Sequence, residues 1–536
     1  MTARVAITCT AVIALATPAA AQSEAVSLAG TWRVAPDPSA SGSDTVRKLG
    51  LTDTADIWLP GSLQAQGHGE LPGMDSPWVG DTRPAEWGRP EYAPYRSADN
   101  FKMPFWLTPD RVFMGAAWYS REVTVPPTWT GKHVSLYLER AHWVTEAWLD
   151  GRPLGKSESL STPHHFDIGA IEPGTYTLDL HIDNSMAYGV GPNAHSMTDH
   201  TQTNWNGVVG AIQLRGSPMV SVEQVRFVPS GASKNAVATV TIRNRTKNAQ
   251  NVDLTAIATN DHAPTATASS SVTVPAQSDQ QATITIDLGS DAAMWSEFTP
   301  LTYHLEVEAN SASGTHSFQT WFGLRDLASA DGRFTINGNP IYLRGTLECA
   351  IFPKTGYPPT DTAEWERIFN RLREFGLNHM RFHSWCPPRA AFLAADKLGM
   401  YLQVEGPFWV NQGPQLGRGA PIDQYVYDET DRILAEFGNH PSFLLMAYGN
   451  EPSGPGPRNM GENFLAEWLN TYKASDDRRF YTSGAGWPIM EESQFHVPYQ
   501  PRIQRWGEGL DSTINSKPPT TRPAYNEYSS SFDAPI

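Results

Sequence analysis

The stretch Phe443-Leu-Leu-Met-Ala-Tyr-Gly-Asn-Glu451-Pro is an apolar run that ends abruptly in an asparagine and a carboxylate. Such a run is typical of a strand buried on both faces, as in a parallel sheet that is covered by helices. In a (β/α) barrel the reactive side chains lie at the carboxyl ends of the strands. Glu451 is therefore a candidate catalytic residue, and Asn450 is a candidate for binding its substrate.

The residues around this stretch alternate between strand-like and helix-like patterns. The expected strands are at 341–344, 377–383, 401–405, 443–448 and 479–483, and the expected helices at 362–375, 389–398, 423–437 and 463–472. Strands that alternate with helices predict a parallel sheet, and their number points to a (β/α)8 TIM barrel. We expect the barrel domain to occupy residues 328–536 and to be incomplete at its C-terminus.

The preceding residues predict two all-β domains. Residues 22–218 consist of short alternating segments separated by Gly, Pro, Asp and Ser, which favours a β-sandwich of the jelly-roll kind. Within them, the dipeptide Asp150-Gly151 predicts a tight hairpin turn. Residues 219–327 have the length and alternation of an immunoglobulin-like β-sandwich, in which the Thr- and Ala-rich segment 265–271 is expected to be a solvated loop.

Residues 1–21 predict a cleavable secretory signal. Arg4 precedes the apolar run 5–16, and Pro18-Ala-Ala-Ala21 supplies small residues for cleavage. The run is too short to span a bilayer, so we expect a periplasmic or extracellular protein without membrane insertion. A net charge of −16 without a basic stripe argues against nucleic acid as a partner.

The cysteines and short motifs argue against a metal site or a cofactor. Cys9 lies in the expected signal, whereas Cys349 and Cys386 each follow an expected barrel strand, and both a disulfide and two free buried thiols fit this pattern. Two cysteines without ligands at suitable spacing do not predict zinc. Residues 151–157 have one residue too few for a phosphate loop, and no serine-esterase elbow occurs.

Polar and aromatic side chains gather at the expected carboxyl ends of the strands. They are Arg344, Glu348, Arg381, His383, Trp385, Glu405, Asn450, Glu451 and Trp487. Carboxylates, hydroxyl-binding groups and stacking rings are what a sugar ring requires. His379, Arg381 and His383 share one face of a strand and lack the Glu of a metalloprotease helix, so we interpret them as polar groups rather than metal ligands.

Glycoside cleavage needs two carboxyl groups, one that donates a proton to the leaving oxygen and one that attacks or activates water. Glu451 fits the proton donor, whose pKa must be raised by a partly apolar site. The alternative for Glu451 is a solvated loop carboxylate before Pro452. A resemblance to a known family favours the catalytic interpretation.

Segments along the chain resemble glycoside hydrolase family 2, which includes β-galactosidases, β-glucuronidases and β-mannosidases. In the β-rich part they are Leu28-Ala-Gly-Thr-Trp32, residues 118–126, 147–151, 201–210 and 294–305, and Phe322-Gly-Leu-Arg325. In the barrel they are residues 338–345, Met380-Arg-Phe-His383, residues 394–401 and Gly449-Asn-Glu451. The resemblance implies that Glu451 is the acid/base and that Arg381, His383 and Asn450 bind the sugar.

The resemblance also implies a departure from the family. Its members carry a nucleophilic glutamate at the end of barrel strand seven, and residues 532–536 resemble only the start of that strand. Glu527 is a candidate substitute. Two hypotheses follow. The first is a secreted retaining exo-β-glycosidase, β-galactosidase-like and acting on terminal sugars of oligo- or polysaccharides, which is inactive without its missing C-terminal nucleophile. The second is a non-catalytic carbohydrate-binding protein.

Overall fold

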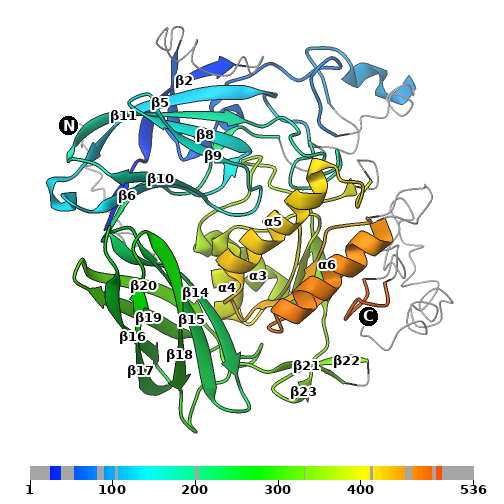
Figure 1. The fold of residues 1–536 in the computed structure, drawn as a ribbon. Helices are drawn as coiled ribbons and strands as arrows, with labels where there is room; N and C mark the ends of the chain where they lie inside the picture. Colours follow the sequence, from blue (N-terminus) through cyan, green and yellow to red (C-terminus); the bar gives the residue numbers. More distant parts are fainter. Residues whose placement is uncertain are drawn as a thin grey trace, which may run out of the picture.

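The structure is a computed structural model that describes residues 24–37, 54–80, 90–102, 107–199, 204–330, 332–410, 415–452, 461–485 and 490–497. Two β-sandwich regions precede a parallel α/β region (Figure 1). The expected signal at residues 1–21, Trp487 and Glu527 lie outside the described residues. In the described part of the chain, no helix is both long and apolar enough to cross a membrane.

The first β-sandwich region is built from antiparallel strands. One sheet has the order β1 (Glu24–Ser27), β13 (Ile212–Ser217), β6 (His133–Leu138) and β10 (His164–Ala170). The second sheet has the order β3 (Ala55–Leu59), β2 (Gly30–Asp37), β5 (Ala116–Val125), β11 (Gly174–Asp183), β8 (Val144–Leu149) and β9 (Arg152–Ser157). A third, small sheet consists of the short strands β4 (Gly61–Ser62), β12 (Gly207–Val208) and β7 (Ala141–His142). The predicted hairpin is confirmed, because Leu149 pairs with Arg152 across Asp150 and Gly151, whose φ angles are 46° and 78°.

The second β-sandwich region packs a three-stranded sheet on a four-stranded one. The first has the order β14 (Val220–Ser230), β15 (Asn235–Asn244) and β18 (Ser278–Asp287), and the second the order β17 (Ala263–Val274), β16 (Gln250–Asn260), β19 (Tyr303–Ser311) and β20 (Gly314–Phe322). The prediction of a loop at 265–271 was wrong, because these residues belong to β17 and pair with β16. β17 is an edge strand whose side chains are mostly exposed or partly exposed, and it therefore has the polar composition of a loop.

The last region begins with a small antiparallel sheet of β21 (Leu327–Ala330), β22 (Arg333–Ile336) and β23 (Asn339–Pro340). Five parallel strands then follow in sequence order: β24 (Gly345–Glu348), β25 (His379–Phe382), β26 (Tyr401–Glu405), β27 (Phe443–Ala447) and β28 (Phe480–Thr482). The helices after the first four strands are α3 (Thr362–Glu374), α4 (Arg389–Leu398), α5 (Pro421–Phe437) and α6 (Gly461–Ser475). This arrangement is consistent with part of a (β/α) barrel.

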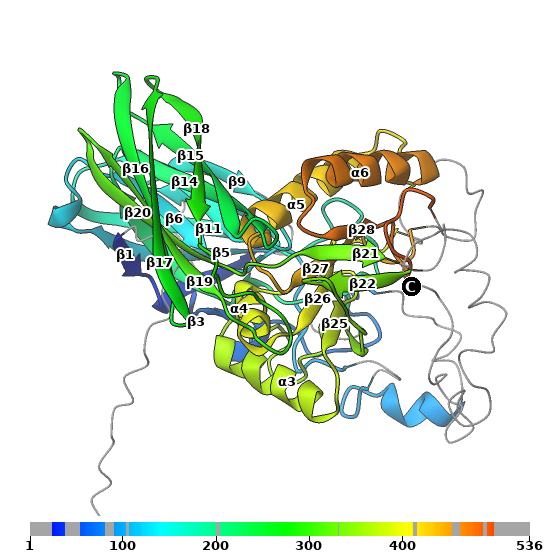
Figure 2. The ribbon, with the colours of Figure 1, turned by 90° about the horizontal axis from the view of Figure 1, so that it is seen from below.

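The first parallel strand lies four residues later than the expected strand at 341–344. Arg344 immediately precedes β24, and its backbone N–H donates to Asn378 Oδ1 (2.8 Å) just before β25, so this residue lies at the amino end of the sheet. By contrast, β26 and β27 are fully buried along their length, as the apolar runs predicted. Figure 2 shows β25–β28 with α3 and α4 on one side and α5 and α6 on the other.

The first β-sandwich region and the α/β region share a hydrophobic core. Trp143, Val190 and Met197 from the sandwich region pack in the same buried cluster as Phe408 and Tyr448 near β26 and β27. Arg140, also from the sandwich region, donates to the carbonyl oxygen of Cys386 (2.7 Å). This shared core holds the loops of the sandwich region against the carboxyl ends of the parallel strands.

Candidate functional site

The candidate site lies where the chain leaves the parallel strands at their carboxyl ends. Ala350 after β24, Ser384 after β25 and Glu451 after β27 have φ angles of 55°, 51° and 37°. Positive φ is unfavourable for residues that carry a Cβ, costing roughly 1–3 kcal/mol, and such residues cluster at functional sites. These three residues with strained backbone therefore lie at the carboxyl ends of the parallel strands, where the sequence predicted the catalytic and substrate-binding residues.

A buried charge pair joins three of the strand ends. Glu405, the last residue of β26, is fully buried, and its Oε1 accepts a hydrogen bond from Arg381 Nε (2.6 Å) on β25. Its Oε2 accepts from the Ser384 backbone N–H (2.7 Å). Arg381 Nη2 in turn donates to Asn450 Oδ1 (2.7 Å) beyond β27. Burial raises the pKa of the Glu405 carboxyl, and the Arg381 charge opposes this rise.

Asn450 is held on both its backbone and its side chain. Its backbone N–H donates to the Phe408 carbonyl (2.9 Å), and the bond from Arg381 fixes Oδ1 as the acceptor. The side chain is 1% exposed, and Nδ2 has no hydrogen-bond partner among the described residues. An oriented donor without a partner thus lies directly beside the partly exposed Glu451.

Two histidines and a tryptophan pack beside this chain of hydrogen bonds. The His383 ring centroid lies 4.6 Å from that of His195 and 4.8 Å from that of Trp409. The hydroxyl of Ser384 lies 3.1 Å from His383 Nδ1 and accepts a hydrogen bond from the His195 backbone N–H (2.9 Å). Burial, with a smaller effect of the His195 ring, holds the pKa of His383 well below its ordinary value, so His383 is neutral at pH 7.

Sequence reasoning did not identify His195. It lies in the wall loop, which we define as residues 184–199 between β11 and β12 of the first β-sandwich region. Nothing in the local pattern marks this histidine, because its partner Ser384 is 189 residues away in the chain. The wall loop is therefore part of the candidate site through tertiary packing alone.

The remaining predicted residues lie at the edge of this arrangement. The Glu348 carboxylate accepts hydrogen bonds from the backbone N–H groups of Ala350 (2.9 Å) and Ile351 (3.0 Å), and burial raises its pKa to about 7. Trp385, expected to contact a sugar, is 1% exposed and packs against Phe382 with ring centroids 5.3 Å apart. The structure thus places Arg381, His383, Glu405, Asn450 and Glu451 together and places Trp385 in the core.

Cys349 and Cys386 are free thiols rather than a disulfide. Cys386 is buried, and burial raises the pKa of its thiol far above the ordinary value, so it carries no thiolate at neutral pH. Burial likewise raises the pKa of Cys349 to about 12. Neither cysteine is a nucleophile for the candidate site.

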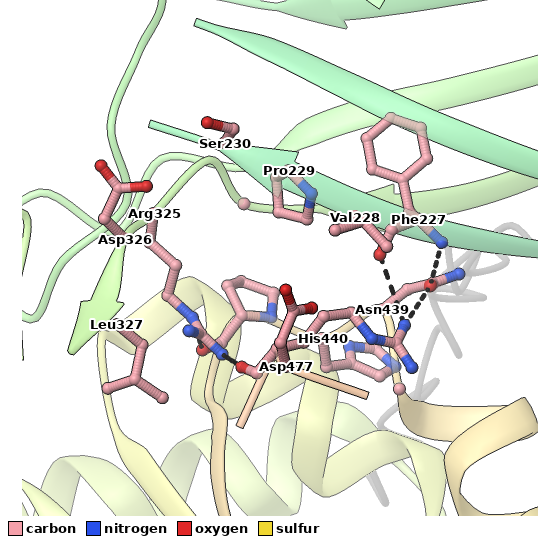
Figure 3. A pocket seen from close by; sticks show the side chains of 14 residues that line it. Phe227, Val228, Pro229, Ser230, Arg325, Asp326, Leu327, Asn439, His440 and Asp477 are labelled. Carbon is pink, nitrogen blue, oxygen red and sulfur yellow. Dashed lines mark hydrogen bonds between the residues drawn. The ribbon is translucent and has the colours of Figure 1, made fainter. Parts of the chain in front are cut away.

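A cavity of about 270 Å³ lies at the opposite edge of the sheet, between β14 and the loops that precede β27 and β28 (Figure 3). Arg325 lines it and donates through Nε to the Pro441 carbonyl (2.8 Å) and through Nη2 to the Arg478 carbonyl (2.9 Å). These loops are at the amino ends of the parallel strands, whereas Glu451 follows a carboxyl end. The cavity is therefore separate from the candidate site.

Comparison with known proteins relates this fold to glycosidases. The family model "Glycosyl hydrolases family 2" matches residues 220–325. The β-galactosidase of Thermoanaerobacter pseudethanolicus is 24% identical over 337 residues, covering 61% of this chain and 44% of the relative. The β-galactosidase of Leuconostoc mesenteroides is 22% identical over 480 residues, covering 87% of this chain and 43% of the relative. The chain thus spans less than half the length of these two curated relatives.

Two solved structures share the fold. The β-galacturonidase of Eisenbergiella tayi bound to galacturonate superposes with a TM-score of 0.71 at 14% identity, covering 97% of this chain and 82% of that one. The β-glucuronidase of Bacteroides uniformis gives a TM-score of 0.68 at 16% identity, covering 91% of this chain and 56% of that one. Domain order, the matched β-sandwich and the β-galactosidase relatives agree, and the chain belongs to glycoside hydrolase family 2.

Proposed function

We propose that this chain is part of a secreted, retaining exo-β-glycosidase that hydrolyses terminal sugars of oligo- or polysaccharides, with Glu451 as the acid/base. The observation that carries the proposal is the position of Glu451. It follows the carboxyl end of β27, on a strained backbone, beside an asparagine that the Arg381–Glu405 pair holds in place. Closure of the parallel sheet into a (β/α)8 barrel belongs to the same proposal.

The geometry gives each neighbour of Glu451 a role. The Asn450 Nδ2 donor binds a sugar hydroxyl next to the anomeric carbon, and its partner Arg381 is a positioning residue. Neutral His383, held at Ser384, donates to or accepts from a further hydroxyl. Such preorganised hydrogen bonds orient the glycosidic oxygen toward the proton on Glu451.

Retention requires a second carboxylate that attacks the anomeric carbon. Glu405 does not serve, because it is fully buried and paired with Arg381. Glu348 does not serve either, because two backbone N–H groups hold its carboxylate in the turn after β24. We therefore propose that the nucleophile is a residue outside the described part of the chain.

The substrate sugar is proposed to be a β-linked neutral hexose such as galactose. The two curated relatives are named as β-galactosidases, and the fold neighbours act on uronides. Arg381 is already neutralised by Glu405, which favours a neutral sugar over a uronate. Export is supported by the signal-like pattern of residues 1–21.

The test is hydrolysis of a panel of p-nitrophenyl β-glycosides by the full-length protein and its Glu451→Gln variant. Removal of the proton donor should slow substrates with poor leaving groups by roughly a hundredfold or more, and activated aryl glycosides by less. Glu374→Gln, at an exposed position at the end of α3, is the matched control. Equal losses on both substrate kinds would refute the role of Glu451, and saturable sugar binding without turnover would favour a non-catalytic binding protein.

A further inference from the structure

Ser384 connects the wall loop to His383 at the carboxyl end of β25. It follows His383 directly, is completely buried and has a φ angle of 51°. Its backbone N–H donates to Glu405 Oε2 (2.7 Å), and its hydroxyl oxygen lies 2.9 Å from the His195 backbone nitrogen and 3.1 Å from His383 Nδ1. The hydroxyl thus has one neighbour in the first β-sandwich region and one in the α/β region.

These two contacts fix the direction of the Ser384 hydroxyl proton. A backbone N–H can only donate, so the bond from His195 uses a lone pair of the hydroxyl oxygen. In the described part of the chain, His383 Nδ1 is the one acceptor within reach of the hydroxyl proton. Because Ser384 is fully buried, a proton that pointed elsewhere would remain without a partner, which is the costly arrangement. The hydroxyl therefore donates to Nδ1.

A hydrogen bond accepted by Nδ1 decides which nitrogen of His383 carries the proton. A neutral imidazole has one protonated and one unprotonated nitrogen, so an accepting Nδ1 requires the proton on Nε2. Burial, with smaller effects of His195 and Arg381, holds the pKa of His383 well below its ordinary value, so a second proton does not bind at neutral pH. His383 is therefore a neutral ring that carries its proton on Nε2.

The Nε2 atom of His383 is available to a substrate. Among the described residues no group bonds to it, and His383 keeps 8% of its surface exposed. The rings of His195 and Trp409 meet the imidazole at interplanar angles of 69° and 61°, and these contacts hold the plane of the ring. The Nδ2 atom of Asn450 is a second donor without a partner in the described part of the site.

We propose that Ser384 is a positioning residue that fixes His383 as a hydrogen-bond donor, so that the site offers two donors, His383 Nε2–H and Asn450 Nδ2–H, to sugar oxygens. A fixed donor discriminates against a sugar that lacks the matching hydroxyl, since the donor would then be buried without a partner. The wall loop contributes to this selection through the His195 N–H, which occupies the other side of the Ser384 hydroxyl. The inference rests on the proposed glycosidase function for its catalytic meaning.

The first test measures the position of the proton without turnover. Nitrogen NMR of the full-length protein with isotope-labelled histidine should show an unprotonated Nδ1 and a protonated Nε2 for His383 near neutral pH, assigned by the signals that His383→Gln lacks. Ser384→Ala should shift the Nδ1 signal because it removes the bonded hydroxyl, whereas Ser290→Ala, at an exposed serine of the second β-sandwich region, should not. A proton on Nδ1, or an Nδ1 signal that Ser384→Ala leaves unchanged, would overturn the proposal.

The second test asks whether Ser384 acts on catalysis through His383. With the glycoside that the panel identifies, Ser384→Ala should lower kcat/KM about tenfold or more in the wild type but less than about twofold in His383→Leu, because the ring that it positions is already absent. Ser384→Gly repeats both tests if Ser384→Ala fails to fold, since a positive φ suits glycine.

The outcomes separate this inference from the proposed function. Equal losses in the wild-type and His383→Leu backgrounds would indicate a structural role of Ser384, and would overturn the inference while the glycosidase stands. The expected NMR signals without turnover of any glycoside would support the fixed donor at His383 and count against the glycosidase.

Discussion

Replacing Gly191 by alanine should separate the wall loop from Trp409, which packs beside the candidate site. The alanine Cβ would lie 1.8 Å from the Trp409 carbonyl oxygen, where contacts under 3.0 Å essentially never occur, so the two backbones must move apart by more than about 1 Å. The shift breaks the 2.8 Å hydrogen bond from the Trp409 N–H to the Val190 carbonyl, worth about 1 kcal/mol. Because φ is +109° at Gly191, the substitution also costs roughly 1–3 kcal/mol of backbone strain.

These contributions sum to about 2–4 kcal/mol, before lost packing is counted, and they act locally. The matched control is Gly131→Ala in the same β-sandwich region, where φ is +76° and a Cβ would meet nothing within 4 Å. Gly131→Ala therefore reports the backbone cost alone. A displacement near 1 Å at a catalytic site can lower kcat/KM about a hundredfold, so Gly191→Ala should be nearly inactive and Gly131→Ala should not.

Amide hydrogen exchange followed by mass spectrometry measures the effect without relying on turnover. Peptides that contain Trp409 and peptides from the wall loop should exchange faster in Gly191→Ala than in the wild type, and at the wild-type rate in Gly131→Ala. The reasoning would be refuted if exchange at Trp409 were the same in both variants. The contact between Gly191 of the wall loop and the Trp409 backbone would then not hold these two segments together.

Three further predictions concern the carboxyl edge. Glu405→Gln should destabilise the protein by about 2–4 kcal/mol in urea denaturation, because it leaves the Arg381 charge, whose side chain is only 16% exposed, without its counter-charge, whereas Glu374→Gln at an exposed ion pair should cost less than about 1 kcal/mol. Burial raises the pKa of Glu348 from 4.5 to about 7, so the folded state keeps a proton that the unfolded state releases. The unfolding free energy should therefore fall by up to about 3 kcal/mol between about pH 4.5 and 7 relative to Glu348→Gln, and parallel pH profiles would contradict this. Trp385→Phe should lower stability by about 1–2 kcal/mol without raising KM, because the ring is buried; a raised KM at unchanged stability would instead indicate substrate contact.

The strands that carry the site were predictable because their signal is local. The strand expected at 401–405 coincides with β26 (Tyr401–Glu405), and the apolar run before Asn450 contains β27. Both strands are buried on both faces, so their composition differs sharply from that of the turns around them. Since parallel strands share one carboxyl edge, the grouping of Arg381, Glu405 and Asn450 follows from the strand assignments.

The errors arise where the local pattern is ambiguous. The first parallel strand, Gly345–Glu348, is partly exposed along its length, so nothing in its burial pattern distinguishes it from the apolar residues 341–343 just before it. The edge strand β17 resembles a loop in composition, because it pairs on one side only and most of its side chains are at least partly exposed to water. In both cases pairing with a neighbour, rather than composition, decides the secondary structure.

By itself the sequence determined the order of the three regions, the parallel strands and the side chains at their carboxyl ends, because periodicity and the direction of a strand are properties of short segments. Only the tertiary structure decided that His195 packs on His383, that Asp199 accepts a hydrogen bond from the backbone N–H of Val79, and that Trp385 is buried. The first two features depend on contacts between segments more than a hundred residues apart, such as the hydrogen bond from Val79 to Asp199 across 120 residues. Such contacts form because the first β-sandwich region and the parallel strands bury their apolar faces in one core, which no local pattern encodes.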